Sequence, residues 1–195
     1  MKYYKLYEDM DRERDIVCYS MSDDNELPLR IFKSGEKYDT WDGSFRFYYD
    51  KSKGNIATDF LKNDKGWFVV SEKLREILEC MNTEIQFLPI KIFEKGKKDE
   101  LKNYYIANIL RVVDVLCLEK SEYFESYIRK RGKVYIVVKY GIFGEKTEKS
   151  DVFKLADQDV FPIFVSHYFK ERIEERGITG IALSEIRVYE NEQCS

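Results

Sequence analysis

The sequence has one histidine, four cysteines and no long apolar run. A helix needs about 20 consecutive apolar residues to span a bilayer, and every apolar stretch in this chain is shorter. Residues 1–15 carry acidic side chains where a signal peptide would need an apolar segment. We therefore predict a cytoplasmic protein that has no membrane partner.

The four cysteines, Cys18, Cys80, Cys117 and Cys194, are scattered and form no CxxC motif. Thiols of a protein that stays in the cytoplasm remain reduced, so we predict no disulfide. Ligands at the spacing of a zinc site are also missing, and we predict neither a structural metal nor a cofactor.

Charged residues are plentiful, but their signs nearly balance, and the formal net charge is -3. Such a balance favours neither nucleic acid nor a membrane surface as a partner. Aromatic residues make up 15% of the chain, most of them Tyr and Phe. The composition is therefore that of a folded protein with a sizeable core.

Strand patterns outnumber helix patterns along the chain. The density of β-branched residues favours a long buried strand over residues 104–118, interrupted at Asn108, although helical spacing also fits. Residues 121–132 are typical of a short helix or an irregular turn. Further strands are predicted at residues 3–7, 15–20, 44–50, 83–93, 133–143, 151–155 and 178–183.

These patterns predict a mixed α+β fold, with a mainly antiparallel sheet and a few helices packed on it. We expect a single domain over residues 1–195. Residues 1–65, which are rich in strands and loops, are a candidate β-rich N-terminal lobe.

One phrase occurs twice, as FVVSEKLREILE at residues 68–79 and as IFVSHYFKERIE at residues 163–174. In each copy a short apolar run leads into a serine, Ser71 or Ser166, which is a good helix N-cap. Replacing either serine with alanine is expected to cost about 1 kcal/mol. Duplication and convergence explain the similarity of the two phrases equally well. In both cases we interpret the phrase as a structural element of the fold.

The helix predicted after Ser71 has an apolar stripe at i, i+3, i+4 and i+7. Asn82 is expected to end this helix in the left-handed conformation, and Gly177 is expected to end the second helix in the same way. The stripe consists of Leu74, Ile77, Leu78 and Met81.

His167 follows Ser166 at the start of the second predicted helix. The helix N-terminus disfavours a protonated ring, and no cysteine or second histidine lies nearby to complete a metal site. No GxSxG motif supports a nucleophile beside it. We therefore interpret His167 as an exposed or half-buried structural residue, in preference to a catalytic one.

Acidic residues offer no clear catalytic pair. Asp114 lies in the most apolar stretch, where a buried carboxylate needs a partner, and we interpret it as a structural acid bonded to Arg111 or to backbone. The acids of residues 9–15 alternate with Arg12 and Arg14, which indicates a solvated, self-compensating segment.

Phosphate-binding signals are weak. Residues 96–98 (GKK) lack the preceding glycine spacing of a phosphate loop. The basic run at residues 128–133 (IRKRGK), with Tyr127 and Tyr135 nearby, has a composition suited to an acidic partner or a nucleic-acid backbone. So short a run in a mildly acidic chain is more often a solvated turn, and we interpret it as one.

Five phrases follow one another in order: WFVVSEKLREILE, IQFLPIKI, YYIANILRVVDVLCLEKSE, DVFKL and IFVSHYFKERIEERGITGIAL. Together they resemble a bacterial family that was formerly catalogued as a domain of unknown function and later assigned to the immunity proteins of polymorphic toxin systems. The resemblance covers about residues 65–185, and the first 65 residues carry no such phrase.

Two motifs of that family can be placed on this chain. Its Tyr-Tyr…Asn…Asp stretch resembles Tyr104, Tyr105, Asn108 and Asp114. Its Phe-Arg-Leu before the last helix appears here with Lys154 in place of arginine, which keeps the charge but removes a bidentate donor. The family supplies no catalytic or binding residues to carry over.

The resemblance implies a non-enzymatic cytoplasmic protein that binds a cognate toxin domain encoded nearby and occludes it. A metal-dependent hydrolase or nuclease-like enzyme on an α+β sheet is the alternative, as is another kind of protein-binding module. A toxin gene immediately upstream favours the first hypothesis. An acidic cluster that holds a divalent metal in a pocket favours the enzyme.

Overall fold

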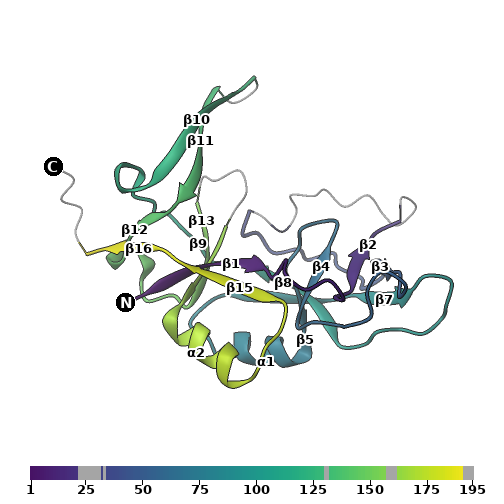
Figure 1. Cartoon of the computed structure of the whole chain (residues 1–195). Coiled ribbons are helices and arrows are strands. Elements are labelled where there is room, and N and C mark those ends of the chain that lie inside the picture. Colours follow the sequence, from purple (N-terminus) through teal and green to yellow (C-terminus); the bar gives the residue numbers. More distant parts are fainter. Residues whose placement is uncertain (22–31, 33, 130–131, 157–161, 191–195) are drawn as a thin grey trace.

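Strands dominate the fold, and two α-helices accompany them in the described part of the chain (Figure 1). The computed structural model describes residues 1–21, 32, 34–129, 132–156 and 162–190. The helices are α1 (Glu72–Glu79) and α2 (His167–Glu175), and two 3-10 turns are η1 (Leu118–Lys120) and η2 (Glu145–Thr147).

A seven-stranded sheet has the order β6-β8-β5-β4-β2-β3-β7. Its edge strands, β6 and β7, are consecutive parts of one segment that is interrupted only at Ile90. The sheet therefore curls round until its two edges meet in that segment. The strands are β2 (Val17–Tyr19), β3 (Arg46–Tyr49), β4 (Phe60–Asn63), β5 (Val69–Ser71), β6 (Ile85–Pro89), β7 (Lys91–Glu94) and β8 (Tyr104–Ile109).

A five-stranded sheet has the order β15-β1-β14-β13-β9. Two further strand pairs stand apart from it, the parallel pair β12-β16 and the antiparallel pair β10-β11. These strands are β1 (Tyr3–Glu8), β9 (Val112–Val113), β10 (Glu122–Ile128), β11 (Gly132–Lys139), β12 (Gly141–Phe143), β13 (Val152–Leu155), β14 (Ile163–Ser166), β15 (Ile181–Glu185) and β16 (Arg187–Tyr189).

Each copy of the repeated phrase belongs to a larger unit of two antiparallel strands and a helix. In the first unit β4 pairs with β5, which leads through Ser71 into α1. In the second unit β13 pairs with β14, which leads through Ser166 into α2. The registers correspond, since Phe60↔Val70 and Leu61↔Val69 are matched by Val152↔Val165 and Phe153↔Phe164.

Both serines cap their helices, as the sequence predicts. The Ser71 hydroxyl accepts a hydrogen bond from the N–H of Leu74 (3.3 Å), and the Ser166 hydroxyl accepts one from the N–H of Phe169 (3.1 Å). Each hydroxyl thus satisfies one of the four N–H groups that have no partner within the helix.

An aspartate at the start of the first unit ties that unit to the second. Asp59 accepts hydrogen bonds from the Ser71 hydroxyl (2.7 Å) and from the N–H of Thr179 (2.9 Å), which lies just after α2. The cap of α1 is therefore connected through one carboxylate to the end of the other helix.

Asp151 makes the reciprocal connection from the second unit. It accepts hydrogen bonds from the Ser166 hydroxyl (2.6 Å) and from the N–H of Asn82 (2.8 Å), which lies just after α1. The two units are therefore linked crosswise, and the repeated phrase has a structural explanation.

Successive side chains of a strand point to opposite faces, so each of the paired strands contributes side chains to two of three apolar cores. Phe60, Val70, Val152 and Val165 face a core that is shared with both helices. Leu61 and Val69 face the core inside the curled sheet, to which all seven of its strands contribute. Phe153 and Phe164 face a third core, together with Tyr3, Val115, Val137, Tyr140, Ile142, Leu155 and Ile186.

The α+β class and the mainly antiparallel pairing are confirmed, although the strands divide into more than one sheet. All four residues of the predicted stripe are buried, three of them on α1 and Met81 just after its end. Gly177 is left-handed (φ 57°) as predicted, but Asn82 is not. The Asn82 side chain instead donates to the carbonyl of Lys149 (3.0 Å), and Cys80 ends the helix in a right-handed conformation.

One prediction of secondary structure is correct in part and another is wrong. The strand predicted within residues 104–118 is confirmed as β8 and β9, but it ends at Val113, and its interruption falls at Leu110 and Arg111 rather than at Asn108. Residues 122–128 form β10 rather than a helix or an irregular turn, because they pair along their length with β11. Cross-strand pairing of aromatic and β-branched side chains stabilises such a ribbon, and a local pattern does not report it.

Candidate functional site

Strands β10 and β11 form a two-stranded arm that projects from the body of the protein (Figure 1). We use the name arm for residues 122–128 and 132–139. At its base, Val137 is buried in the third core beside Tyr140. The remainder of the ribbon extends away from the sheets (Figure 1), and among the described residues neither of its strands pairs with a strand outside the arm.

One face of the arm is rich in tyrosine and carries charges that are paired within it. Tyr123 and Tyr135 pack edge to face, with their ring centroids 5.1 Å apart. Lys133 forms an ion pair with Glu125 (2.5 Å) and lies over the Tyr135 ring, 5.4 Å from its centroid. Tyr127, opposite Lys133 in the ribbon, is 75% exposed. We call this the tyrosine face.

On the opposite face, the described residues from Phe124 to Ile128 and from Gly132 to Ile136 carry no charge, while Glu122 and Lys139 pair with each other at the base of the arm (2.8 Å). The cross-strand pairs Phe124↔Ile136, Ser126↔Val134 and Ile128↔Gly132 alternate with those of the tyrosine face. Phe124 is 67% exposed and Ile136 is 56% exposed. We call this the uncharged face.

Exposed apolar side chains concentrate on this arm. Of the fourteen large hydrophobic residues that are exposed in the described part of the chain, seven lie in β10 and β11. Single exposed apolar residues are ordinary, but a contiguous group of them marks an interaction surface. They are Tyr123, Phe124, Tyr127, Ile128, Tyr135, Ile136 and Val138.

The predicted solvated turn at residues 128–133 connects the two strands of the arm. Ile128 ends β10 and Gly132 begins β11, while residues 130–131 lie outside the described residues. Sequence reasoning missed the arm as a binding surface, although Tyr123, Glu125 and Tyr127 alternate there with Phe124, Ser126 and Ile128. This period of two is the signal of a strand with two different faces.

Lys154 is a second notable group, because its amine is buried in the protein interior. It is 4% exposed and donates hydrogen bonds to the carbonyls of Ile109 (2.7 Å) and Phe32. Burial lowers the pKa of Lys154 from its usual value of 10.5 to about 8. A buried amine of this kind can serve as a base or as a structural donor.

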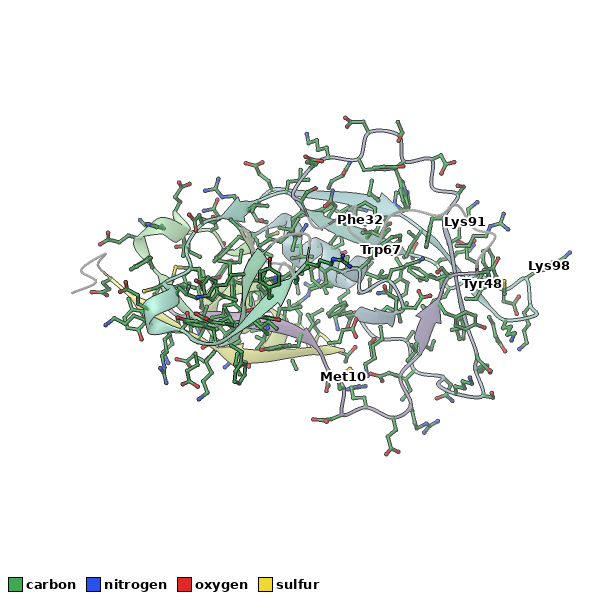
Figure 2. The ribbon with its side chains drawn as sticks, turned by 90° about the horizontal axis from the view of Figure 1, so that it is seen from above. Met10, Phe32, Tyr48, Trp67, Lys91 and Lys98 are labelled. Carbon is green, nitrogen blue, oxygen red and sulfur yellow. The ribbon has the colours of Figure 1, made fainter. Side chains whose placement is uncertain are left out.

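The partners of Lys154 identify a structural role. Phe32 packs edge to face against Trp67 inside the curled sheet, with the ring centroids 4.9 Å apart (Figure 2). Nearby, the Asn108 amide donates to the carbonyl of Glu36 (2.9 Å), and the N–H of Tyr38 donates to the side-chain oxygen of Gln86 (2.9 Å). Buried and partly buried polar side chains thus fasten Phe32, Glu36 and Tyr38 to the sheets.

The pKa of Lys154 leads to a testable pH dependence. Between about pH 7 and pH 9.5, the free energy of unfolding of the wild-type protein should rise by about 2 kcal/mol relative to that of a Lys154→Met variant. Native Lys154 loses its proton near pH 8, while the unfolded chain keeps it until about pH 10.5. The unfolded state therefore binds more protons in this window, and the penalty for burying the charge disappears as the pH rises.

Urea titrations of both proteins at the two pH values measure this difference. Burial raises the pKa of the Cys18 thiol to about 12, which makes native stability fall at high pH, but this effect is common to both proteins and cancels. If the free energies of unfolding of the wild-type protein and of Lys154→Met changed equally with pH, Lys154 would not be desolvated in the folded protein.

The acids that sequence analysis singled out do not meet at one site. Asp114 is exposed, so its prediction as a buried structural acid is wrong. Its neighbour Arg111 instead forms an ion pair with Glu148. Asp15, expected in a solvated segment, is buried and accepts hydrogen bonds from the Arg12 guanidinium (3.0 and 3.1 Å).

His167 is exposed at the start of α2, which confirms the exposure that the sequence predicts. Its Nδ1 atom lies 3.0 Å from the Tyr4 hydroxyl, and its Nε2 atom lies 3.6 Å from Glu171. Within the described residues, no group of three or more His, Cys, Asp or Glu side chains is placed to hold a metal ion. Nor does any helix there have the length and apolar character to cross a membrane.

The Tyr-Tyr…Asn positions are embedded in the fold. The Tyr104 hydroxyl donates to the carbonyl of Thr58 (2.9 Å), and the Tyr105 ring lies 4.7 Å from the Arg75 guanidinium carbon. Asn108 is fully buried in β8. These residues stabilise the curled sheet and lie outside the arm.

Comparison with known proteins identifies one family. A sequence model with the description Immunity protein family (Imm11) matches residues 2–188. The match thus includes the first 65 residues, in which the ordered phrases do not occur. A search of curated proteins finds no match.

Proposed function

The chain belongs to the Immunity protein family (Imm11), and we propose that it binds a cognate bacterial toxin domain and neutralises it by occlusion, without catalysis. The observation that carries this proposal is the family match over nearly the whole chain. We place the action in the cytoplasm of the producing cell, with the toxin domain encoded by a neighbouring gene.

The arm supports the proposal, because it offers what a specific protein interface needs. Tyrosine and other aromatic side chains are enriched at interface centres, since a planar ring buries a large area at a modest entropic cost. Seven large hydrophobic side chains lie exposed on these two strands. They contribute little to the packing of the three cores and remain available to a partner.

Co-expression tests the proposal. Cells that produce the neighbouring toxin domain should survive when this protein is also produced and die when it is absent. The two chains should then co-purify as one complex. The matched control is the same toxin with an immunity protein encoded beside a different toxin, which should give no protection. Survival without any complex would contradict neutralisation by binding.

A further inference from the structure

We propose that the arm is the element that engages the toxin, and that it does so by entering a cleft of the toxin domain. This inference rests on the proposed function and adds the surface and its mode of contact. Three features of the arm carry it: its exposure on both faces, its size and its distribution of charge.

The arm is small for a contact made through one of its faces alone. A strand of seven residues spans about 24 Å and a two-stranded ribbon is about 10 Å wide, so one face has a projected area on the order of 250 Å². A specific complex buries about 800 Å² on each partner. One face alone is therefore too small, and a partner reaches the required area by surrounding the ribbon.

Both faces of the arm are suited to such an enclosed contact. The uncharged face presents Phe124 and Ile136, and the tyrosine face presents Tyr127, all more than half exposed. Burial of only one face would leave the aromatic side chains of the other in water. A concave partner covers both.

A second copy of this chain fits the arm less well. Two arms stacked face to face would bury only about 250 Å² on each copy by the same estimate, which is far below the area of a stable dimer. The toxin domain is the occupant that we therefore assign.

Charge on the arm specifies the chemistry of the cleft. The ion pair between Glu125 and Lys133 is internal to the tyrosine face, and Glu122 pairs with Lys139 at the base of the arm. Between Phe124 and Ile128, and between Gly132 and Ile136, the uncharged face carries no charged side chain. Arg129 follows β10 directly and is exposed. The matching cleft has apolar walls and an acidic group where Arg129 arrives.

A charge introduced on the uncharged face tests the inference. The variants are Phe124→Asp and Ile136→Asp, and the matched control is Val17→Asp, because Val17 lies on β2 and is 56% exposed, the same fraction as Ile136. The probe is the toxin domain encoded beside this gene, recovered from the co-purified complex. Each arm variant should bind it at least about 100-fold more weakly, while the control should bind within about 3-fold of wild type.

Outcomes of this test separate the two levels of the proposal. If the wild-type protein captures no toxin, the proposed function fails and the role of the arm fails with it. If wild type binds and the arm variants bind equally well, only the arm is refuted. Equal weakening by Val17→Asp would also refute it, as would an arm-dependent dimer whose disruption leaves toxin binding unchanged.

Hydrogen exchange on the wild-type complex gives the same answer without any substitution, in case an arm variant fails to fold. Amides of residues 122–128 and 132–139 should exchange more slowly in the complex than in the free protein, and those of β2 should be unchanged. An arm whose amides keep their free exchange rates would overturn the inference.

Discussion

Replacing Phe164 with alanine is expected to lower the free energy of unfolding by about 4 kcal/mol, the largest loss that we predict for a single substitution. Phe164 lies on β14 between β1 and β13, is fully buried, and packs against Tyr140 (5.2 Å between ring centroids) and Phe153 (5.7 Å). The cavity left by its ring cannot collapse, because strands on both sides hold the backbone in register.

Phe124→Ala is the matched control for this loss. The same side chain is removed, but Phe124 is 67% exposed on the arm, and the free energy of unfolding should change by less than about 0.5 kcal/mol. Urea denaturation of the two variants measures the contrast. A similar loss in both variants would mean that Phe124 stabilises the fold. The exposed side chains of the arm would then no longer indicate a binding surface.

Asp151→Ala should cost about 3 kcal/mol, because its carboxylate holds two groups that lie far apart in sequence. The substitution removes the acceptor for the Ser166 hydroxyl and for the N–H of Asn82, and both donors belong to buried or partly buried groups. It weakens the N-cap of α2 and the junction after α1 together. Asp151→Asn keeps one acceptor oxygen and the shape of the side chain, so it should cost less.

Asp59→Ala provides the comparison within the same molecule. Asp59 makes the reciprocal contacts to Ser71 and Thr179. It is only partly buried, so water can accept some of the hydrogen bonds that its carboxylate accepts in the wild-type protein. We expect a loss of about 2 kcal/mol. Thermal or urea unfolding of the three aspartate variants tests the order. A larger loss for Asp59→Ala than for Asp151→Ala would contradict the ranking by burial, and a negligible loss for both would contradict the crosswise linkage.

Local patterns in the sequence predict the parts of this fold that are held together locally. Both N-caps, the apolar stripe of α1 and the left-handed Gly177 follow from neighbours within four residues along the chain. The end of α1 is different, because Asn82 is held by Asp151 and Lys149, about 70 residues away. A local rule for helix ends therefore fails at Asn82 and succeeds at Gly177.

Long-range pairing explains the remaining differences. Asp151 was part of a predicted strand, yet the sequence contains no sign that its carboxylate would meet the end of the other helix. Residues 122–128 look ambiguous alone and become a strand only because β11 lies beside them. Burial is equally non-local, since Asp114 lies in an apolar stretch and is exposed, while Asp15 lies among charges and is buried.

Family membership and surface location draw on different information. The phrases that resemble the immunity family lie mainly in the two strand–strand–helix units and in β8, which build the cores. The arm lies between the third and fourth phrases in sequence and shares only Glu122 with the third. The family could therefore be predicted from phrases that build the scaffold, whereas the candidate binding surface emerged only from the exposure of β10 and β11.

The most direct test of neutralisation by binding is a titration of toxin activity against this protein at a toxin concentration far above the dissociation constant. Activity should fall in proportion to the protein added and reach zero at about one equivalent, because each molecule occludes one toxin domain. Complete protection by a small fraction of an equivalent would show turnover and contradict occlusion, as would residual activity in the presence of excess protein.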